Sequence, residues 1–260
     1  METPKSKTVL FVTGAFVTHR GWDKWKEYFE ANGYTTLAPP WPHKDAPAKV
    51  LRKRHPDPGI ASVRLEDVVD HYAEIIAGLP EEPIIIGHSF GGLVTQLLLQ
   101  RGFGVAAVVI HSVPPQGVLT FKWSFFKAVW GPLGLFTSTK KTFLMSFPQW
   151  QYAFTNGMSL EEQQQSYDEN VIPESKLASR DGLTSAAKIN FKKPHPPLLF
   201  IAGTNDNIMP ASLNYSNYKK YKDKSSVTNF KEFSENNHYV VGMPNWKETA
   251  GYALNWIKSL

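Results

Sequence analysis

Residues 83–99 read Pro-Ile-Ile-Ile-Gly-His-Ser-Phe-Gly-Gly-Leu-Val-Thr-Gln-Leu-Leu-Leu, and this stretch decides the fold. The apolar run 83–86 predicts a buried strand, and the leucines and valine of 93–99 predict one apolar face of a helix. Between strand and helix stands the pattern Gly-x-Ser-x-Gly, centred on Ser89. A strand, such a turn and a helix in this order expose a nucleophilic serine at the carboxyl end of the strand. The stretch therefore predicts Ser89 as a catalytic nucleophile.

The remainder of the chain repeats the alternation of strand and helix. Apolar runs typical of strands buried in a parallel sheet lie at 8–13, 34–38, 105–110, 198–202 and 227–233. Helical spacing follows the first run at 22–29, recurs at 62–76 with Ser62 as a cap, and ends the chain with Asn245 and Glu248 as a capping pair. Residues 39–58, rich in proline and charge, read as a loop. We expect an α/β fold with a mostly parallel sheet of about six strands and helices on both faces.

Residues 113–193 break this alternation. They open on Pro114-Pro115, and Ser159 with Glu162 and Pro173 with Glu174 read as two helix starts. We expect them to form a helical cap inserted into a core domain made of residues 1–112 and 194–260. The insertion is dense in aromatic residues, which form either the core of the cap or direct contacts with a substrate.

A serine nucleophile needs a base, and the base needs a carboxylate that orients it. Asp206 follows the strand 198–202, and His238 lies between the last strand and the last helix. The order Ser89, Asp206, His238 is the order expected of α/β hydrolases. Among the other histidines, His111 at a strand end and His19 beside the first loop are the rivals of His238.

An oxyanion formed at Ser89 needs two backbone donors. The first predicted donor is the N–H of Phe90, directly after the nucleophile, beside the positive end of the helix dipole. The second comes from the loop after the first strand, where Ala15 is the first choice and Phe16 the second.

Composition excludes several classes of function. The chain has 260 residues, a formal charge of +5 and no cysteine, so disulfides, thiolate chemistry and Cys-ligated metals are excluded. The basic residues are dispersed, which argues against a nucleic-acid partner. No run of eighteen apolar residues occurs, and residues 1–7 lack the apolar segment of a signal peptide. We expect a soluble cytoplasmic protein, monomeric or homodimeric, with no membrane partner, no metal and no cofactor.

With these residues in view, the chain resembles the α/β-hydrolase superfamily from residue 8 to the final helix. The resemblance rests on Gly87-His88-Ser89-Phe90-Gly91-Gly92, on the segment 203–210 with its aspartate, and on Asn237-His238. It is nearest to small single-domain members with a helical cap, which include esterases, lactonases, cofactor-free haloperoxidase-like enzymes and hydroxynitrile lyases. Two departures stand out: the first loop reads Thr13-Gly14 where such proteins usually read His-Gly, and the chain starts near the family's third strand, implying six strands instead of eight.

The resemblance and the site residues together favour a serine hydrolase that cleaves small, largely apolar carboxylic esters or lactones through an acyl-enzyme. Serine at position 89 excludes mechanisms that need an aspartate nucleophile. Two alternatives stay open: a cofactor-free lyase or carbon–carbon hydrolase that uses the same triad as a base, and a non-catalytic ligand-binding protein. The candidate substrate contacts are Phe16, His88, Trp123, Trp130 and Phe147.

Overall fold

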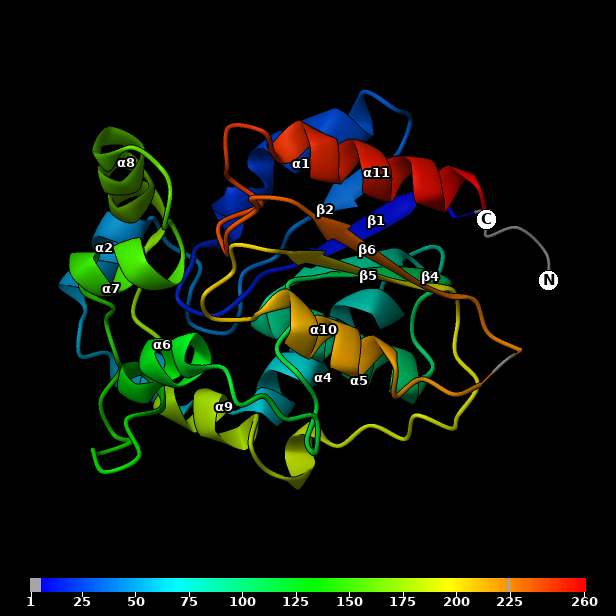
Figure 1. The fold of residues 1–260 in the computed structure, drawn as a ribbon. Helices are drawn as coiled ribbons and strands as arrows, with labels where there is room; N and C mark the ends of the chain where they lie inside the picture. Colours follow the sequence, from blue (N-terminus) through cyan, green and yellow to red (C-terminus); the bar gives the residue numbers. More distant parts are fainter. Residues whose placement is uncertain (1–5, 224) are drawn as a thin grey trace.

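The described residues, 6–223 and 225–260 of a computed structural model, form a six-stranded parallel sheet with helices on both faces (Figure 1). The strand order is β2-β1-β3-β4-β5-β6. The strands are β1 (Thr8–Val12), β2 (Thr35–Leu37), β3 (Ile84–His88), β4 (Ala106–Ile110), β5 (Leu198–Gly203) and β6 (Thr228–Phe233). Residues 1–5, which carry most of the argument for a protein that is not exported, lie outside the described part.

The strands predicted from apolar runs are confirmed. Their burial explains why apolar and polar residues hardly alternate along them. Every residue of β1, β3, β4 and β5 is buried, since helices cover both faces of the central strands. The pairing sets Val9 beside Ile84 and Ile84 beside Ala106, so apolar residues stack across the sheet. The edge strand β6 is more polar and only half-buried.

Two layers of helices cover the sheet. On one face lie α1 (Asp23–Glu30) and α11 (Trp246–Lys258), and on the other lie α4 (Leu65–Ala77), α5 (Phe90–Arg101) and α10 (Ala211–Tyr218) (Figure 1). The helix α5 begins directly after Ser89 and ends at Gly102, which has a φ of 96°. A glycine in this left-handed conformation is the expected C-cap.

Three details of the predicted helices are wrong. The expected loop 39–58 contains α2 (Ala48–Lys53) and the start of α3 (Pro58–Ser62). Ser62 ends α3 instead of capping α4, whose first turn is held by Asp67 accepting from the N–H of Arg64. Asn245 precedes α11, but its side chain donates to Asn236 and makes no cap. Local sequence patterns gave wrong helix bounds here, because segments with few apolar residues can still form short helices against the core.

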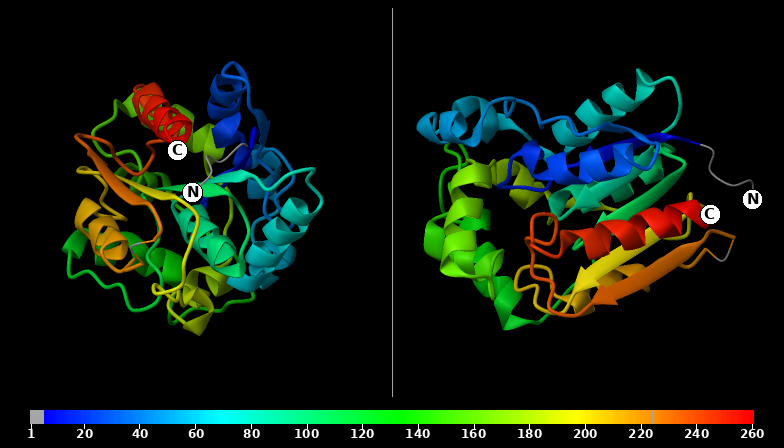
Figure 2. Two further views of the ribbon diagram at one scale, coloured as in Figure 1. Left: turned by 90° about the vertical axis from the view of Figure 1, so that its right-hand side faces the viewer. Right: turned by 90° about the horizontal axis from the view of Figure 1, so that it is seen from above.

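The chain between β4 and β5 folds into helices at one end of the molecule. They are α6 (Trp123–Leu133), α7 (Phe147–Ala153), α8 (Leu160–Asn170) and α9 (Lys176–Asp181), followed by the 3₁₀ segment η2 (Ser185–Ala187). Another 3₁₀ segment, η1 (His19–Trp22), lies between β1 and α1. The arrows of β5 and β6 point toward this end, and the C-terminus lies at the other (Figure 2). None of the helices in the described ranges is both long and apolar enough to cross a membrane.

One predicted helix start between β4 and β5 is confirmed and one is wrong. Ser159 Oγ accepts from the N–H of Glu162, and Glu162 accepts from the N–H of Ser159 at 2.9 Å, which is a capping box. Pro173 and Glu174 do not begin a helix, because α9 starts at Lys176 with Ser175 as its cap. Glu174 instead pairs through its backbone with Phe143.

Candidate active site

Ser89 lies at the tip of the turn between β3 and α5. Its φ of 56° and ψ of −120° are unusual for a residue other than glycine, so the turn is strained. A Cβ atom on Gly91 would collide with the backbone of Val12, and one on Gly87 with Thr95 and Gly91. The two glycines of the pattern are therefore needed for space, and they hold the serine at the carboxyl end of β3.

Three side chains far apart in the sequence form a hydrogen-bonded series at this point. Ser89 Oγ lies 2.8 Å from His238 Nε2, and His238 Nδ1 lies 2.7 Å from Asp206 Oδ2. All three side chains are buried. His238 follows β6 and Asp206 follows β5, so the parallel strands bring both loops to the edge of the sheet where Ser89 lies.

Asp206 is fixed through both carboxylate oxygens. Oδ1 accepts from the backbone N–H groups of Ile208 and Met209, at 2.9 and 2.6 Å. Burial alone would raise the pKa of the Asp206 carboxyl, but the charge of His238 and the hydrogen bonds from both neighbouring histidines outweigh it and hold the pKa below its usual value. The group is thus an anion that orients the imidazoles around it.

His111, the rival base, contacts the aspartate instead of the serine. Its Nδ1 lies 2.6 Å from Asp206 Oδ2, the same oxygen that His238 contacts. Burial lowers the pKa of His111 against the opposing effect of Asp206, and its Nε2 has no hydrogen-bond partner among the described residues. The ring fits there because Gly203 lacks a Cβ, which would lie 2.6 Å from the ring. The other rival, His19, lies in η1 and takes no part in the series.

The potential ligand atoms of His111, Asp206 and His238 all lie within 4.8 Å of one another, close enough to be considered as a metal site. Both imidazole Nδ1 atoms, however, approach the same oxygen of Asp206 at hydrogen-bond distance. Ligands of one ion surround it at about 2.0–2.2 Å and point at the ion instead of at one another. The arrangement fits two N–H donors that share a carboxylate.

His88, inside the serine turn, points away from Ser89. Its Nε2 lies 2.9 Å from the carbonyl oxygen of His238 and donates to it, so His88 supports the loop that carries His238. Burial lowers the pKa of His88 well below its usual value, and the nearby His238 and His111 lower it further. A neutral His88 is the form that this site stabilises.

The backbone N–H groups of Ala15 and Phe90, the predicted donors, have different contacts from that of Phe16, the second choice. The N–H of Phe90 begins α5 and has no acceptor within the helix. The N–H of Ala15 has no protein acceptor in the described ranges, whereas the N–H of Phe16 donates to Glu174 Oε2 at 2.8 Å. Phe16 has a φ of 70°, which turns its amide toward Glu174. Ala15 and Phe90 are thus the pair left free to bind an anion.

Glu174 and Lys44 were not found by sequence reasoning. Lys44 Nζ lies 2.6 Å from Glu174 Oε1, both side chains are almost fully buried, and the ammonium lies 3.9 Å from the centre of the Trp41 ring. Burial lowers the pKa of Lys44, and the charge of Glu174 opposes that shift. The pair fixes the loop of Ala15 and Phe16 from a segment about 160 residues away in sequence. No local pattern in the sequence links these positions.

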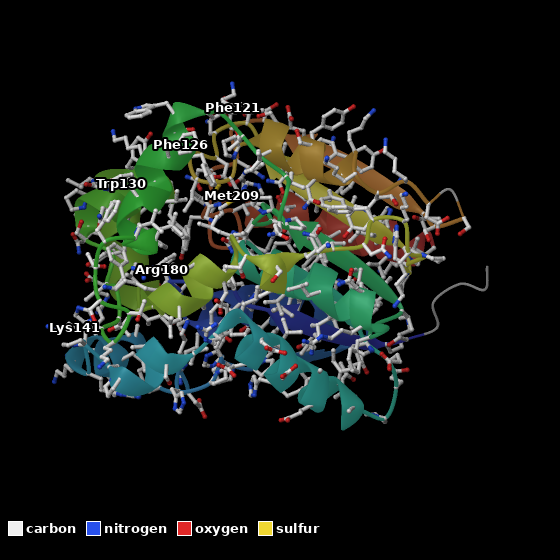
Figure 3. All side chains as sticks on the ribbon, turned by 90° about the horizontal axis from the view of Figure 1, so that it is seen from below. Phe121, Phe126, Trp130, Lys141, Arg180 and Met209 are labelled. Carbon is white, nitrogen blue, oxygen red and sulfur yellow. The ribbon has the colours of Figure 1, made fainter. Side chains whose placement is uncertain are left out.

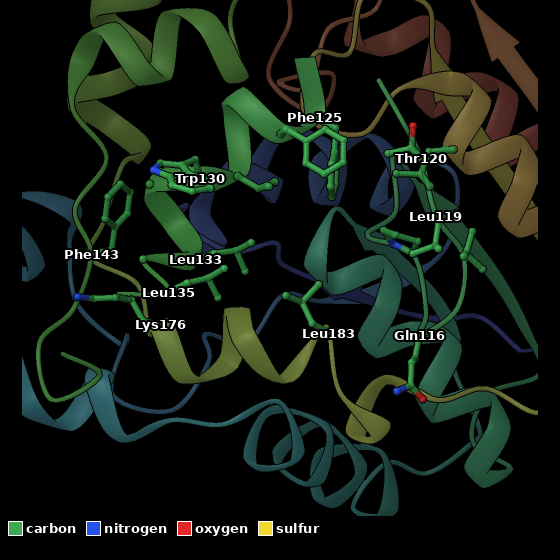
Figure 4. A pocket seen from close by; sticks show the side chains of 18 of the residues that line it. Gln116, Leu119, Thr120, Phe125, Trp130, Leu133, Leu135, Phe143, Lys176 and Leu183 are labelled. Atoms are coloured by element: carbon green, nitrogen blue, oxygen red, sulfur yellow. The ribbon is translucent and has the colours of Figure 1, made fainter. Parts of the chain in front are cut away.

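Two adjacent cavities share part of their wall, and the inner one reaches the serine. The inner one, about 90 Å³, is lined by Ser89, Ala15 and Phe16 among mostly apolar residues. The outer groove, about 750 Å³, runs between α6, α9 and the loop 114–120 (Figure 4). The two share the following lining residues: Pro114, Phe125, Val129, Leu133, Gly182 and Leu183.

The predicted substrate contacts divide among these spaces. Phe16 lines the inner cavity, and Trp130 lines the outer groove. His88 lies behind Ser89 and lines a third, smaller cavity. Trp123 is 76% exposed and Phe147 packs against Tyr167, so both lie outside the linings of the two adjacent cavities. The sequence could not separate these aromatic residues, because the α6 region mixes groove-lining and outward-facing positions.

The comparisons with known proteins agree with this fold. A sequence model of the Alpha/beta hydrolase family matches residues 9–250. A monoacylglycerol lipase of Paleococcus ferrophilus superposes with a TM-score of 0.72 at 18% identity, over 100% of this chain and 96% of the lipase. A pyrethroid hydrolase of Sphingobium faniae JZ-2 gives 0.66 at 17% identity, over 96% and 97%. An extracellular α/β hydrolase of a Paenibacillus species gives 0.69 at 20% identity, over 95% and 98%. No curated protein sequence shows significant similarity.

Proposed function

The chain belongs to the Alpha/beta hydrolase family, and from that premise we propose that it is a serine hydrolase acting on carboxylic esters or lactones. The observation that carries the proposal is the series from Ser89 Oγ through the His238 imidazole to the Asp206 carboxylate, with distances of 2.8 and 2.7 Å. A base within hydrogen-bond reach of a hydroxyl, itself oriented by a carboxylate, is the arrangement that activates a serine.

In the proposed reaction, His238 Nε2 takes the proton from Ser89 Oγ as the oxygen attacks the carbonyl carbon of the ester. The tetrahedral intermediate collapses, the bond to the alkoxy oxygen breaks, and His238 gives its proton to the departing alcohol. Water then attacks the acyl-enzyme by the same route, releasing the acid and restoring Ser89. Asp206 keeps the His238 Nδ1–H directed away from the serine and stabilises the imidazolium that forms.

The N–H groups of Ala15 and Phe90 are the proposed donors to the negative oxygen of the intermediate. We leave Phe16, the second choice, out of this role because its N–H is engaged by Glu174. The N-terminus of α5 adds the positive end of a helix dipole beside the same oxygen.

The substrate is proposed to be largely apolar. The inner cavity is lined by Phe16, Phe125, Val129 and similar side chains, and it adjoins an apolar groove large enough for a bulky or extended group. We propose that residues 113–193 act as a cap that encloses this space, since α6 and α9 contribute much of its wall. The solved structures of similar fold include a monoacylglycerol lipase and a pyrethroid hydrolase, which supports this proposal.

The decisive experiment combines a fluorophosphonate probe with a panel of p-nitrophenyl esters. We expect stoichiometric labelling of the wild type at Ser89 and turnover of the esters. The variant Ser89→Ala is expected to lose labelling and at least about 10⁴-fold in kcat, with an unchanged free energy of unfolding. Turnover retained by Ser89→Ala would refute the assignment of the nucleophile. Absence of both labelling and turnover in the wild type would favour the lyase or ligand-binding alternatives.

A further inference from the structure

The outward face of α6 is aromatic. Trp123, Phe126, Lys127 and Trp130 are spaced at i, i+3, i+4 and i+7, so they share one side of the helix. Their aromatic members are 76%, 44% and 69% exposed, in sequence order. Helices on the surface of globular proteins normally place polar residues on this side. The opposite side, with Ala128, is already buried, so the exposed aromatic face is not needed for packing within the chain.

Neighbouring loops extend this face into a patch. Phe121 is 92% exposed, and Phe136 is 88% exposed with its ring 6.4 Å from that of Trp130. Phe121, Phe126 and Trp130 follow one another along the end of the molecule that is remote from the C-terminus, and Lys141 lies beyond them (Figures 2 and 3). We call the patch the docking surface, and its members are Leu119, Phe121, Trp123, Phe126, Trp130, Leu135 and Phe136. Exposed apolar patches of this kind mark interaction sites.

The segment that carries the docking surface has charged side chains of one sign only. Residues 111–160 contain no aspartate or glutamate, and their lysines are all exposed: Lys122, Lys127, Lys140 and Lys141. Fifty consecutive residues without an acidic side chain stand out in a chain whose formal net charge is only +5. The partner that complements this surface therefore offers apolar volume and negative charge together.

We propose that the docking surface binds an anionic lipid surface. Tryptophan and phenylalanine side chains enter the boundary between headgroups and acyl chains, and lysines beside them interact with anionic headgroups. A second copy of the chain is a poorer partner, because a two-fold contact through this patch would bring the lysines of both copies together. The expectation of no membrane partner rested on the lack of a spanning segment, and docking on one leaflet does not need such a segment.

The docking surface also borders the route to the serine. Phe126, Trp130 and Phe136 line the outer groove, which shares part of its wall with the inner cavity at Ser89. An apolar ester dissolved in the lipid could thus pass through the groove to the nucleophile. This second step rests on the proposed function, whereas docking itself does not depend on the chemistry at Ser89.

The test is co-sedimentation with vesicles of phosphatidylcholine, with and without phosphatidylglycerol. We expect the wild type and Ser89→Ala to bind the anionic vesicles equally, and more weakly at high salt. Each lysine near such a surface contributes about fivefold, so the triple variant Lys122→Gln, Lys140→Gln, Lys141→Gln should bind about 100-fold more weakly. Phe121→Ser should lose about tenfold. Both variants should hydrolyse a soluble p-nitrophenyl ester like the wild type.

The matched controls remove similar groups elsewhere. The triple variant Lys219→Gln, Lys220→Gln, Lys222→Gln removes the same charge directly after α10 (Figure 1), and Val227→Ser removes an exposed apolar side chain directly before β6. Both should bind like the wild type. Equal loss in control and docking-surface variants, or no binding to anionic vesicles, would overturn the proposal. A dimer that Phe121→Ser dissociates would assign the surface to a second copy. Vesicle binding without hydrolysis of any ester would leave docking standing and refute the proposed function.

Discussion

The helices α1 and α6 carry the same kinds of side chain with opposite exposure. Trp25 and Phe29 of α1 are fully buried, and Trp25 stacks on Phe29 while its Nε1 donates to Val241. Trp123 and Trp130 of α6 are 76% and 69% exposed. The helix α1 packs against the sheet beside α11, whereas α6 lies beyond the strand ends and packs against α7 and α9. Aromatic content alone thus says nothing about whether a helix builds the core or offers a surface.

Substituting one tryptophan in each helix tests this contrast most directly. Trp25→Ala removes a fully buried side chain and its hydrogen bond, so the free energy of unfolding is expected to fall by about 3–5 kcal/mol. Trp123→Ala removes an exposed side chain and should change it by less than about 0.5 kcal/mol. Urea denaturation followed by circular dichroism measures both. A loss of stability in Trp123→Ala as large as that in Trp25→Ala would mean that the α6 face is packed in solution.

The segment around Glu174 sharpens the comparison, because it lies between β4 and β5 like α6 but is buried. Glu174→Gln leaves the ammonium of Lys44 buried without its counter-charge, so the free energy of unfolding should fall by about 3 kcal/mol. Because Glu174 holds the N–H of Phe16, kcat for ester hydrolysis should fall while KM changes little. Arg101→Gln, which breaks an exposed pair with Asp70, is the control and should cost less than about 1 kcal/mol. An equal loss of unfolding free energy in Glu174→Gln and Arg101→Gln would contradict a stabilising role for the buried pair of Lys44 and Glu174.

The pH dependence of the free energy of unfolding also distinguishes the buried site from α6, with a smaller expected effect. Burial lowers the pKa of both His88 and His111 below 6.5, so below that pH the unfolded chain binds more protons than the folded one. The free energy of unfolding should therefore have its full value above about pH 6.5. At lower pH it should fall by up to about 1.4 kcal/mol per pH unit for each histidine. Urea unfolding between about pH 7.5 and about pH 5.5 measures this slope.

Variants assign the slope to the buried site. His88→Gln should reduce it, since the buried imidazole that resists protonation is gone. Trp123→Ala should leave it unchanged, because α6 contains no histidine. A slope that His88→Gln does not alter would place the titrating groups elsewhere in the molecule.

Local patterns predicted the part of the fold that depends on short stretches of chain. The strands were found from uninterrupted apolar runs, and the turn at Ser89 from two glycines at fixed spacing, since a buried parallel strand and a tight turn each restrict composition strongly. The same reasoning failed at Ser62, because α4 starts at Leu65 instead. At Asn245 the helix begins where predicted, but the side chain donates to Asn236 and makes no cap. It also placed a helix start at Glu174, whose carboxylate is engaged with Lys44 and Phe16 instead.

The sequence by itself determined an α/β fold with parallel strands and the candidates Ser89, Asp206 and His238, because each follows from a short motif and its order in the chain. Only the tertiary structure decided that His111 shares Asp206 with His238 and that Glu174 occupies the amide of Phe16. It also decided that Trp123, Phe126 and Trp130 of α6 are exposed. These features join residues about 95 and 158 positions apart, or depend on what covers a helix. Hydrogen bonds and burial follow distance in space, which no local pattern of residues contains.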